Sequence, residues 1–573
     1  MNQVLTQAVQ RGVGSSFCIA RFGVVAAILF PLQWASPASA GVWSDADTLS
    51  GHNPSEQFGW WVAGIGDLDG DGFTDLGVGA HFFTPGTDTN AGAVYLIGGG
   101  LPPGAPPMAR LDGLSRDEHF GECLAGGRDI DGDGVPDVVV GAPLRDSGAL
   151  RAAGAVDVFR GAPGMGNSRW ATLHGEAADD WFGQSVAVGD VDGDGFADII
   201  VGAPFNDRHG SAAGAVFIYR GGPLASTTPW KILVGEAAND QFGWAVAYVG
   251  DTNGDGFGDL VVGARFHTAL PKLAAGRVYL YRGGEAMDTL ADGSWTGEAS
   301  NDSFGSAVWG PGDADGGGRP DILVGAPFND RGGSGSGAAY LFRGEAAPGS
   351  APAAIYVGES ANAQLGYSVG GAGDVNGDGR PDLIVGARFQ ASGTLSAAGR
   401  AYVFAGGPTL STTPLATADG EAANDWFGQS VGGAAGFFNA SRSALFVGAP
   451  LQDQPGSEAG RAYALGERPT TGIPAEPAAP RAIAAWPSPA RGSVELSWAS
   501  LRAGTAEISV HDVSGRELFR WSCSEGATSR MNAHWDGRDF TGQRVPPGLY
   551  VVNVRPSGES SAQGMTARVV IVR

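Results

Sequence analysis

A nine-residue acidic motif recurs along this chain at nearly constant intervals. Its copies begin at Asp67, Asp129, Asp190, Asp251, Asp313 and Asp374, and successive starts are 62, 61, 61, 62 and 61 residues apart. A period this regular indicates that one structural unit is repeated, and it is not expected of a chance run of acid. The chain must therefore fold as copies of a single unit, each contributing one acidic loop.

The residues of the motif indicate a calcium loop. Between Asp190 and Asp198, Asp occupies positions 1, 3, 5 and 9, and Gly at positions 4 and 6 lets the backbone turn sharply. Converging carboxylates repel one another unless a cation lies among them. Ca²⁺ accepts about six to eight oxygens in a flexible geometry, and the carbonyl of Phe196 at position 7 can supply one more. Mg²⁺ requires a stricter octahedron, and softer metals favour His or Cys, which the motif lacks.

The expected ligands are the side chains at positions 1, 3, 5 and 9 and the carbonyl at position 7. They are Asp67, Asp69, Asp71, Phe73 and Asp75; Asp129, Asp131, Asp133, Val135 and Asp137; Asp190, Asp192, Asp194, Phe196 and Asp198; Asp251, Asn253, Asp255, Phe257 and Asp259; Asp313, Asp315 and Asp321; and Asp374, Asn376, Asp378, Arg380 and Asp382. In the fifth loop Gly317 replaces a carboxylate, so we expect it to bind most weakly. The sequence predicts about five or six calcium sites with a mainly structural role.

An EF-hand is the nearest alternative for such a loop. It requires a bidentate Glu at position 12 and flanking helices. The twelfth residues counted from Asp67 and Asp190 are Val78 and Val201, and the flanking runs such as Ile199–Val201 are of β type. The pattern therefore favours a calcium turn between two strands.

Two further motifs recur in register with the acidic loops. A Phe-Gly pair, Leu-Gly in one repeat, precedes each loop, and Gly-Ala-(Pro/Arg/His) follows it, as in Gly202-Ala203-Pro204. Counting these pairs gives seven repeats, of which the seventh, at 435–443, has lost its Asp residues. Each repeat contains four β-type runs, as at 182–188, 199–202, 215–219 and 230–234. The sequence predicts an all-β fold with a seven-bladed β-propeller over residues 41–467.

The two ends of the propeller region predict how its ring closes. Leu49 lies nine residues before Phe58, as Leu173 lies nine before Phe182, so the segment Trp43–Gly51 has the pattern of a fourth strand. The last repeat ends after its third strand. We expect the first strand to complete the seventh blade by contact between Trp43–Leu49 and Arg461–Leu465, which pairs both edges of that sheet.

Residues outside the propeller region are of three kinds. Residues 1–40 have the Arg, apolar run and Ala38-Ser39-Ala40 site of a secretory signal peptide, and no other apolar run is long enough to span a membrane. Residues 468–489 form a Pro-rich linker. Residues 490–573 show short alternating strands and turns that fit a small Ig-like β-sandwich. The product is expected to be secreted or attached to the cell surface.

Charge and cysteine content limit the classes of function. The formal net charge is −24, and the six loops contain 21 of the 60 acidic residues. This balance argues against a nucleic-acid partner. Cys18 falls in the signal peptide, and Cys123 and Cys523 lie in different halves of the chain, so a disulfide framework is not indicated. Cys123 and Cys523 are each expected instead to be a small buried residue.

The three motifs together resemble the FG-GAP repeats of the integrin α-subunit propeller over residues 41–467. The resemblance implies a seven-bladed propeller with Ca²⁺ in the loops of the lower face. It also implies that partners bind the upper face, here through loops that include Phe205–Gly210, Asp179–Trp181, Asn239-Asp240 and Asn424–Trp426. The leg domains and membrane span of integrins are absent from the pattern, so an integrin role is not implied.

The C-terminal segment has a resemblance of its own. Val510–Glu517, Trp535–Asp539 and Gly548-Leu549-Tyr550 resemble the Ig-like module of the bacterial flagellar hook-capping protein and the C-terminal sorting domains of type IX secretion substrates. This resemblance implies a bacterial source and attachment or sorting through residues 490–573.

The sequence favours a binding or adhesion protein that presents its upper face to an extracellular protein or glycan. Asp-Trp pairs such as Asp180-Trp181 and Asp425-Trp426 can bind sugars, although solvated turns beside a core Trp are more frequent. Two alternatives stay open: a polysaccharide hydrolase or lyase on a propeller scaffold, and a purely structural spacer. Six of the eight histidines occupy non-equivalent template positions in the propeller region and two lie in the C-terminal segment, and no catalytic triad or His-metal spacing emerges.

Overall fold

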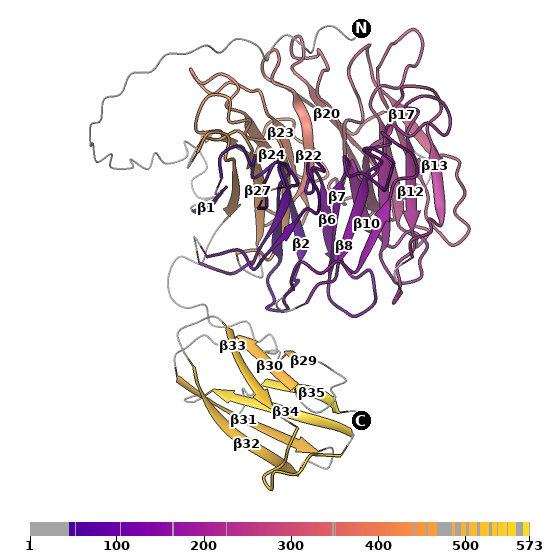
Figure 1. Cartoon of the computed structure of the whole chain (residues 1–573). Helices are drawn as coiled ribbons and strands as arrows, with labels where there is room; N and C mark the ends of the chain where they lie inside the picture. The colour runs from indigo at the N-terminus through magenta and orange to yellow at the C-terminus, as the bar shows by residue number, and fades with distance from the viewer. Residues whose placement is uncertain are drawn as a thin grey trace, which may run out of the picture. The chain divides into compact units, whose positions relative to one another are not determined.

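The computed structural model describes most of the predicted propeller and the strands that follow it. The described residues are 45–466, except 52, 87, 103–104, 163–164, 225, 346–348, 350, 439–441 and 454–455, and then 484–486, 494–499, 504–512, 516–525, 530–535, 537–546, 548–556 and 565–571. The predicted signal peptide lies outside them. Every regular element of the described residues is a β-strand, which confirms the all-β fold (Figure 1). No helix of these residues is long and apolar enough to cross a membrane.

Within residues 45–466 the strands form seven antiparallel four-stranded sheets. Six sheets follow chain order: β2 (Trp61–Gly66), β3 (Asp75–Ala80), β4 (Ala93–Ile97), β5 (Ala109–Asp112); β6 (Leu124–Arg128), β7 (Asp137–Ala142), β8 (Ala155–Phe159), β9 (Ala171–His174); β10 (Ser185–Gly189), β11 (Asp198–Ala203), β12 (Ala215–Tyr219), β13 (Lys231–Val234); β14 (Phe242–Gly250), β15 (Asp259–Ala264), β16 (Arg277–Tyr281), β17 (Gly293–Thr296); β18 (Ala307–Gly312), β19 (Asp321–Ala326), β20 (Ala338–Phe342), β21 (Ala354–Val357); and β22 (Leu365–Gly373), β23 (Asp382–Ala387), β24 (Arg400–Phe404), β25 (Ala416–Asp419).

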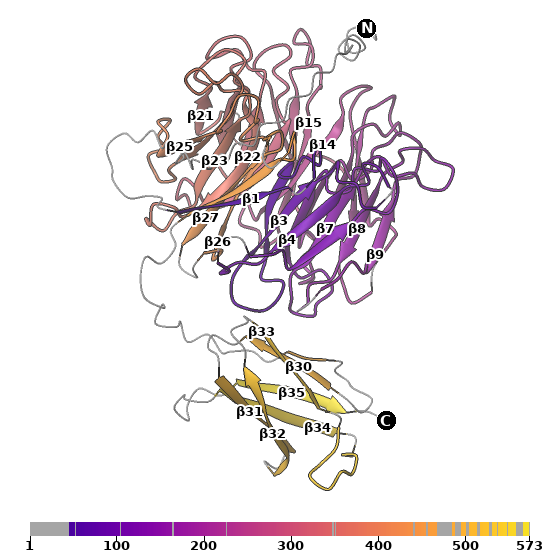
Figure 2. The same cartoon turned by 60° about the vertical axis from the view of Figure 1, so that its left-hand side comes forward.

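The remaining sheet joins the two ends of this region. It contains β26 (Val431–Ala435), β27 (Ser443–Ala449), β28 (Arg461–Gly466) and, beside β28, the first strand β1 (Asp45–Ser50). The register pairs Asp45 with Gly466 and Leu49 with Ala462. Figure 2 shows β1 in indigo among the orange strands of the last sheet. The predicted clasp between the first and last strands is therefore confirmed.

The first strands of the seven sheets contact one another in a closed ring. β2 contacts β6, β6 contacts β10, and the series continues through β14, β18, β22 and β26 back to β2. Repeated four-stranded sheets with their first strands innermost are consistent with a β-propeller. Because every sheet in the ring repeats the same strand order, the loops that follow equivalent strands lie at the same end of the ring.

Apolar sequence patterns explain why the second and third strands are central. In β11, Asp-Ile-Ile-Val-Gly-Ala is buried along its whole length, as expected of a strand covered on both faces by neighbouring sheets. β12 is buried throughout, whereas β13 at the outer edge is only partly buried. The Phe of each Phe-Gly pair packs between sheets; the ring of Phe182 lies 5.4 Å from that of Phe217.

The glycine after that Phe is required by both backbone conformation and space. Gly183 has φ +90°, and a Cβ there would lie 2.6 Å from the carbonyl oxygen of Ala155. Any other residue at this position would have to adopt a left-handed backbone conformation, and its Cβ would also clash with the main chain. The Phe-Gly motif therefore marks the point where one sheet approaches the backbone of the next.

The C-terminal strands form two further sheets, described here by themselves. One contains β29 (Ala484–Trp486), β30 (Val494–Ala499) and β33 (Arg530–Trp535), and the other contains β32 (Glu517–Glu525), β31 (Gly504–Asp512), β34 (Gly548–Pro556) and β35 (Met565–Ile571). An Ig-like sandwich over 490–573 stays a prediction. β29 lies within the predicted linker: its flanking prolines indicated extended coil, yet its register pairs it with β30.

Candidate functional site

The acidic loops connect the first and second strands of six sheets, and the first Asp of each loop organises the turn. In the third loop Asp190 accepts hydrogen bonds from the backbone N–H groups of Gly193 at 2.7 Å and Gly195 at 3.0 Å. Both glycines have positive φ, 81° and 92°. The Asp and Gly positions of the motif are thus explained by the turn itself.

The ninth residue of each loop begins the second strand and is buried. Asp75 accepts from the N–H of Leu68 at 2.8 Å through one oxygen and from that of Gly99 at 3.0 Å through the other. Burial raises the pKa of Asp75 to about 7; these two hydrogen bonds oppose the rise, and the charges of Asp69 and Asp71 add to it. Burial likewise raises the pKa of Asp198 to about 7. A cation beside these carboxylates would relieve an unfavourable concentration of negative charge.

Carboxylate oxygens converge in four of the six loops. Three acidic side chains have oxygens within 4.8 Å of one another in the sets Asp67, Asp69 and Asp71; Asp129, Asp131 and Asp137; Asp190, Asp192 and Asp194; and Asp313, Asp315 and Asp321. In the fourth and sixth loops, Asn253 and Asn376 instead donate to Asp255 and Asp378 at 2.7 and 3.0 Å. The donors are all oxygens, so the residues present fit a hard cation such as Ca²⁺.

Arginines reach the third position of three loops. Arg220, at the end of the third strand, lies 2.5 Å from Asp192, and Arg343 lies 2.5 Å from Asp315. Arg160 pairs with Asp131 in the same way. A bound cation in these loops would share Asp131, Asp192 and Asp315 with a guanidinium, a competitor that the nonapeptide pattern did not reveal. The whole ligand set stays a prediction.

The opposite ends of the second strands define the surface that we call the upper face. It begins at the residue that follows each Gly-Ala pair. That residue is Pro in four repeats, but it is His81 after β3, Arg265 after β15 and Arg388 after β23. These three polar side chains therefore occupy equivalent places around the ring.

Arg265 is stacked on aromatic rings. Its guanidinium carbon lies 3.0 Å from the ring centroid of Trp244 and 4.5 Å from that of Phe266, and its Nε donates to Gln241 at 2.8 Å. Burial lowers the pKa of Arg265 to about 9, with the Tyr367 charge acting in the opposite direction. No carboxylate within the described residues pairs with this guanidinium.

Arg388 has the same kind of surroundings. Its guanidinium carbon lies 3.5 Å from the ring centroid of Tyr367 and 5.1 Å from that of Trp426. It donates to Gln364 at 3.0 Å and Gln429 at 3.1 Å, both neutral amides. Burial lowers the pKa of Arg388 as well. Two guanidinium groups thus lie half-buried on the upper face without a carboxylate partner in the described part of the chain.

Three Asp residues of the predicted partner loops are buried, whereas Asp179 and Asp207 in the same loops are exposed. Asp180, Asp240 and Asp425 are 2%, 3% and 2% exposed. Asp180 accepts from Asn206 at 2.8 Å, and Asp240 lies 2.8 Å from Nδ1 of His267. The carboxylates of Asp180 and Asp425 are therefore buried within their loops, and sugar binding by Asp180-Trp181 and Asp425-Trp426 stays a prediction.

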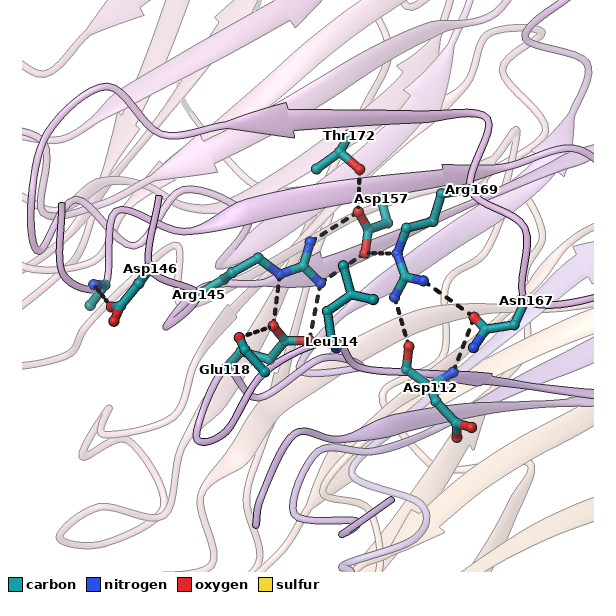
Figure 3. Close-up of polar contacts among 11 residues, drawn as sticks. Asp112, Leu114, Glu118, Arg145, Asp146, Asp157, Asn167, Arg169 and Thr172 are labelled. Atoms are coloured by element: carbon teal, nitrogen blue, oxygen red, sulfur yellow. Dashed lines mark hydrogen bonds and ion pairs between the residues drawn. The ribbon is translucent and has the colours of Figure 1, made fainter. Parts of the chain in front are cut away.

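A buried ion-pair network holds the loop between β5 and β6. Figure 3 shows Arg145 between Glu118 and Asp157, with Arg169 on the far side of Asp157. Arg145 donates to Glu118 at 2.8 and 3.1 Å and to Asp157 at 3.0 and 2.8 Å. Arg169 donates to Asp157 at 2.6 Å, and Thr172 donates at 2.7 Å. Glu118 is adjacent to His119, so the network positions the residues that follow it.

One cluster on the upper face combines nitrogen and oxygen donors. His81, His119 and Glu122 offer ligand atoms that all lie within 4.8 Å of one another. Burial lowers the pKa of both imidazoles and raises that of Glu122 to about 7, where Trp60 and Gln184 oppose the rise by hydrogen bonding. No local sequence pattern indicates this cluster, because His81 and His119 belong to different repeats and to different template positions.

Comparison with known proteins agrees with the repeat pattern. Five segments match the FG-GAP repeat: residues 58–97, 120–159, 182–219, 242–281 and 365–404. The fold and these matches define a β-propeller protein that carries FG-GAP repeats. Part of the chain is also similar in sequence to integrin α subunits. Integrin alpha-5 of Xenopus laevis is 36% identical over 248 residues, 41% of this chain and only 22% of the integrin's length.

Two solved structures are similar to this chain, both with TM-scores below 0.5. PorZ, a surface component of the type-IX secretion system of Porphyromonas gingivalis, covers 89% of this chain and 60% of its own, with 14% identity and a TM-score of 0.34. FlgD of Xanthomonas campestris, a flagellar hook-capping protein, covers 16% of this chain and 62% of its own, with 24% identity and a TM-score of 0.12.

Proposed function

We propose that this chain is a secreted or cell-surface binding protein whose β-propeller is stabilised by Ca²⁺ and contacts an extracellular protein or glycan through its upper face. The observation that carries the proposal is the pair Arg265 and Arg388, which are stacked on aromatic rings, donate to neutral amides and have no carboxylate partner among the described residues. Similarity to integrin α subunits and the signal peptide expected at 1–40 support the extracellular setting.

The two arginines favour an anionic group on the partner. Partial burial weakens the hydration of a guanidinium, and a carboxylate that approaches it forms charge-assisted hydrogen bonds about twice as strong as neutral ones. Aromatic rings beneath the guanidinium hold it in place and add a cation–π contribution. We therefore expect carboxylate-bearing ligands, such as acidic polysaccharides or acidic peptide segments, to bind better than neutral ones.

Calcium has a supporting role in this proposal. The loops contain oxygen donors only, and they lie at the end of the sheets opposite Arg265 and Arg388. Ca²⁺ there would fix the turn between the first and second strands without contacting the partner. Removal of the ion is expected to lower stability first and to affect binding only through loss of folding.

Binding of polygalacturonate and of neutral dextran, each immobilised, tests the upper face. In excess calcium we expect retention on polygalacturonate, and a loss of about tenfold or more in affinity for R265Q and R388Q, since each removes a charged hydrogen bond worth about 1.5–3 kcal/mol. R520Q, which removes an equal charge from an exposed C-terminal strand, is the control. Equal binding by all variants would contradict the proposed surface, and release of reducing ends would indicate an enzyme instead.

A further inference from the structure

We propose that His81, His119 and Glu122 form a binding site for a transition-metal ion, zinc by preference, with one coordination position left open. The site lies on the upper face, between the sheet of β2–β5 and the sheet of β6–β9. It is separate from the acidic loops and from Arg265 and Arg388, and it does not depend on the proposed partner.

The three side chains approach from two repeats. His81 follows β3, and His119 and Glu122 lie in the connection between β5 and β6. Nε2 of His81 and Nδ1 of His119 each lie 4.0 Å from Oε2 of Glu122. The two imidazole rings have centroids 5.2 Å apart. A short shift of these side chains brings the donors to the separation of about 3.3 Å that tetrahedral ligands have around zinc with bonds of about 2.0–2.1 Å.

The donor set distinguishes this site from the calcium loops. Two imidazole nitrogens and one carboxylate suit zinc and similar divalent ions, whereas Ca²⁺ and Mg²⁺ take oxygen ligands. Three protein ligands of this kind leave the fourth zinc position for water or an incoming group. Calcium present in excess should therefore fill the loops and leave the His81 cluster available to zinc.

The burial of His81 is a second, independent indication of a ligand. Its side chain is only 3% exposed, and Nδ1 has no hydrogen-bond partner within the described residues. A buried polar atom without a hydrogen-bond partner destabilises the folded state. Ligation would offset that loss through Nδ1, or after a turn of the ring that exchanges the places of its two nitrogens. The side chains of His119 and Glu122 are 21% and 16% exposed, so the cluster is open on one side.

The surroundings hold the cluster in position. The ring of Trp60 lies 4.2 Å from that of His81, and the ring of Phe82 lies 4.8 Å from that of His119. His119 has φ +55°, and Glu118 immediately before it is fixed by two hydrogen bonds from Arg145. Ligands held in this way lose little conformational freedom when a metal binds, which favours affinity.

Titration of the mature protein with Zn²⁺, followed by calorimetry in excess calcium, tests the proposal directly. We expect one equivalent to bind with a dissociation constant in the micromolar range or tighter. Co²⁺ as a spectroscopic probe should show the visible bands of a tetrahedral site with nitrogen ligands. Absence of both signals in folded wild-type protein would overturn the proposal, whatever the behaviour of the variants.

Three substitutions and one control test whether zinc binds at His81, His119 and Glu122. E122Q and H119N should each weaken zinc binding about tenfold or more, given that even indirect partners of a metal change affinity 10–100-fold. H119N retains a residue type that tolerates positive φ. H81F should have the same effect, while H174Q, at an exposed histidine in β9, should bind as wild type does. Zinc binding unchanged in all three cluster variants, or lost only in H174Q, would refute the assignment.

Discussion

Arg145 and Asp157 form a two-point ion pair inside the sheet of β6–β9. Nη1 of the arginine lies 3.0 Å from Oδ1 of the aspartate and Nη2 lies 2.8 Å from Oδ2, with side chains 6% and 0% exposed. The same guanidinium also holds Glu118, in the connection that leads to β6. The pair thus joins the interior of one sheet to the loop that supplies part of the upper face.

Asp157→Asn should destabilise the protein strongly. It leaves Arg145 and Arg169 buried with less compensating charge, and breaking a buried pair in this way typically costs about 3–5 kcal/mol. The free energy of unfolding in urea measures the effect. Asp179→Asn is the matched control, because Asp179 and its partner Arg151 are 54% and 77% exposed and such pairs contribute about 1 kcal/mol or less. If both variants lose the same free energy of unfolding, the buried pair contributes no more to stability than the exposed pair.

The ion pair of Arg145 and Asp157 also makes part of the free energy of unfolding depend on pH. Burial alone would raise the pKa of Asp157, but the hydrogen bonds and charge of Arg145 and then Arg169 outweigh it, and the pKa lies below 3.8. The contribution of a carboxylate with a lowered pKa is complete above its unfolded pKa and is lost as pH falls through the folded one. The difference in melting temperature between wild type and Asp157→Asn should therefore stay constant from neutral pH down to the unfolded pKa and shrink below it. A difference that shrinks already near neutral pH would contradict this.

Removal of calcium should lower the melting temperature. An ion that binds only the folded state stabilises it by about 2.7 kcal/mol per site at a free concentration 100 times its dissociation constant. Chelator should reduce the melting temperature of wild type, and readded Ca²⁺ should restore it. Asp194→Asn removes one charge from the third loop and should lower the number of bound ions found by metal analysis. No bound calcium and no shift would mean that the loops are solvated turns.

The clasp is tested by two adjacent residues of β1. Leu49 packs partly buried against the cluster that contains Phe58 and Phe446, whereas Thr48 is exposed. Leu49→Asp should lower the unfolding free energy by roughly 2 kcal/mol or more, since it places a charge against apolar surface. Thr48→Asp keeps the same strand and charge but should have little effect. Similar melting temperatures for the two variants would argue against a stabilising clasp.

The Phe-Gly glycine offers a further test. Gly183→Ala adds a Cβ 2.6 Å from the carbonyl oxygen of Ala155 at φ +90°, whereas Gly148→Ala adds one at φ +62° with no atom within 4 Å. The second substitution measures the conformational cost alone, about 1 kcal/mol. The first should cost clearly more in urea unfolding, because the neighbouring sheet must also move. If both substitutions lower the free energy of unfolding equally, the neighbouring sheet can move to accommodate the added Cβ without loss of stability.

Much of the propeller region could be predicted because its repeats carry redundant signals. The run Ala215–Tyr219 is apolar throughout, and the structure places β12 at those residues. The spacing of Leu49 from Phe58 indicated a strand, and the register of β1 with β28 confirms it. The local pattern of apolar residues predicts where strands form, and the interval between repeated motifs predicts how the strands are grouped into sheets.

Contacts between repeats could not be predicted in the same way. His81 and Glu122 approach because two neighbouring sheets bring different template positions together, which no local pattern records. The family resemblance placed Asp180 in a partner-binding loop, but the amide of Asn206 provides a partner that allows this carboxylate to be buried. Arg220 near Asp192 is a third case, since the arginine follows β12 and the aspartate precedes β11.

The pairing of β1 with β28 also constrains the order of events when the chain is made. β1 leaves the ribosome before any other strand of its sheet, and its strand partner among the described residues, β28, is the last of the region to be made. Intermediate sheets can form from neighbouring segments as they appear, but the ring stays open until residue 466 is free. Pairings this distant in sequence are slow to form. During synthesis the region therefore stays an unclosed arc, with the exposed edges of β1 and of the newest sheet as its sites of aggregation.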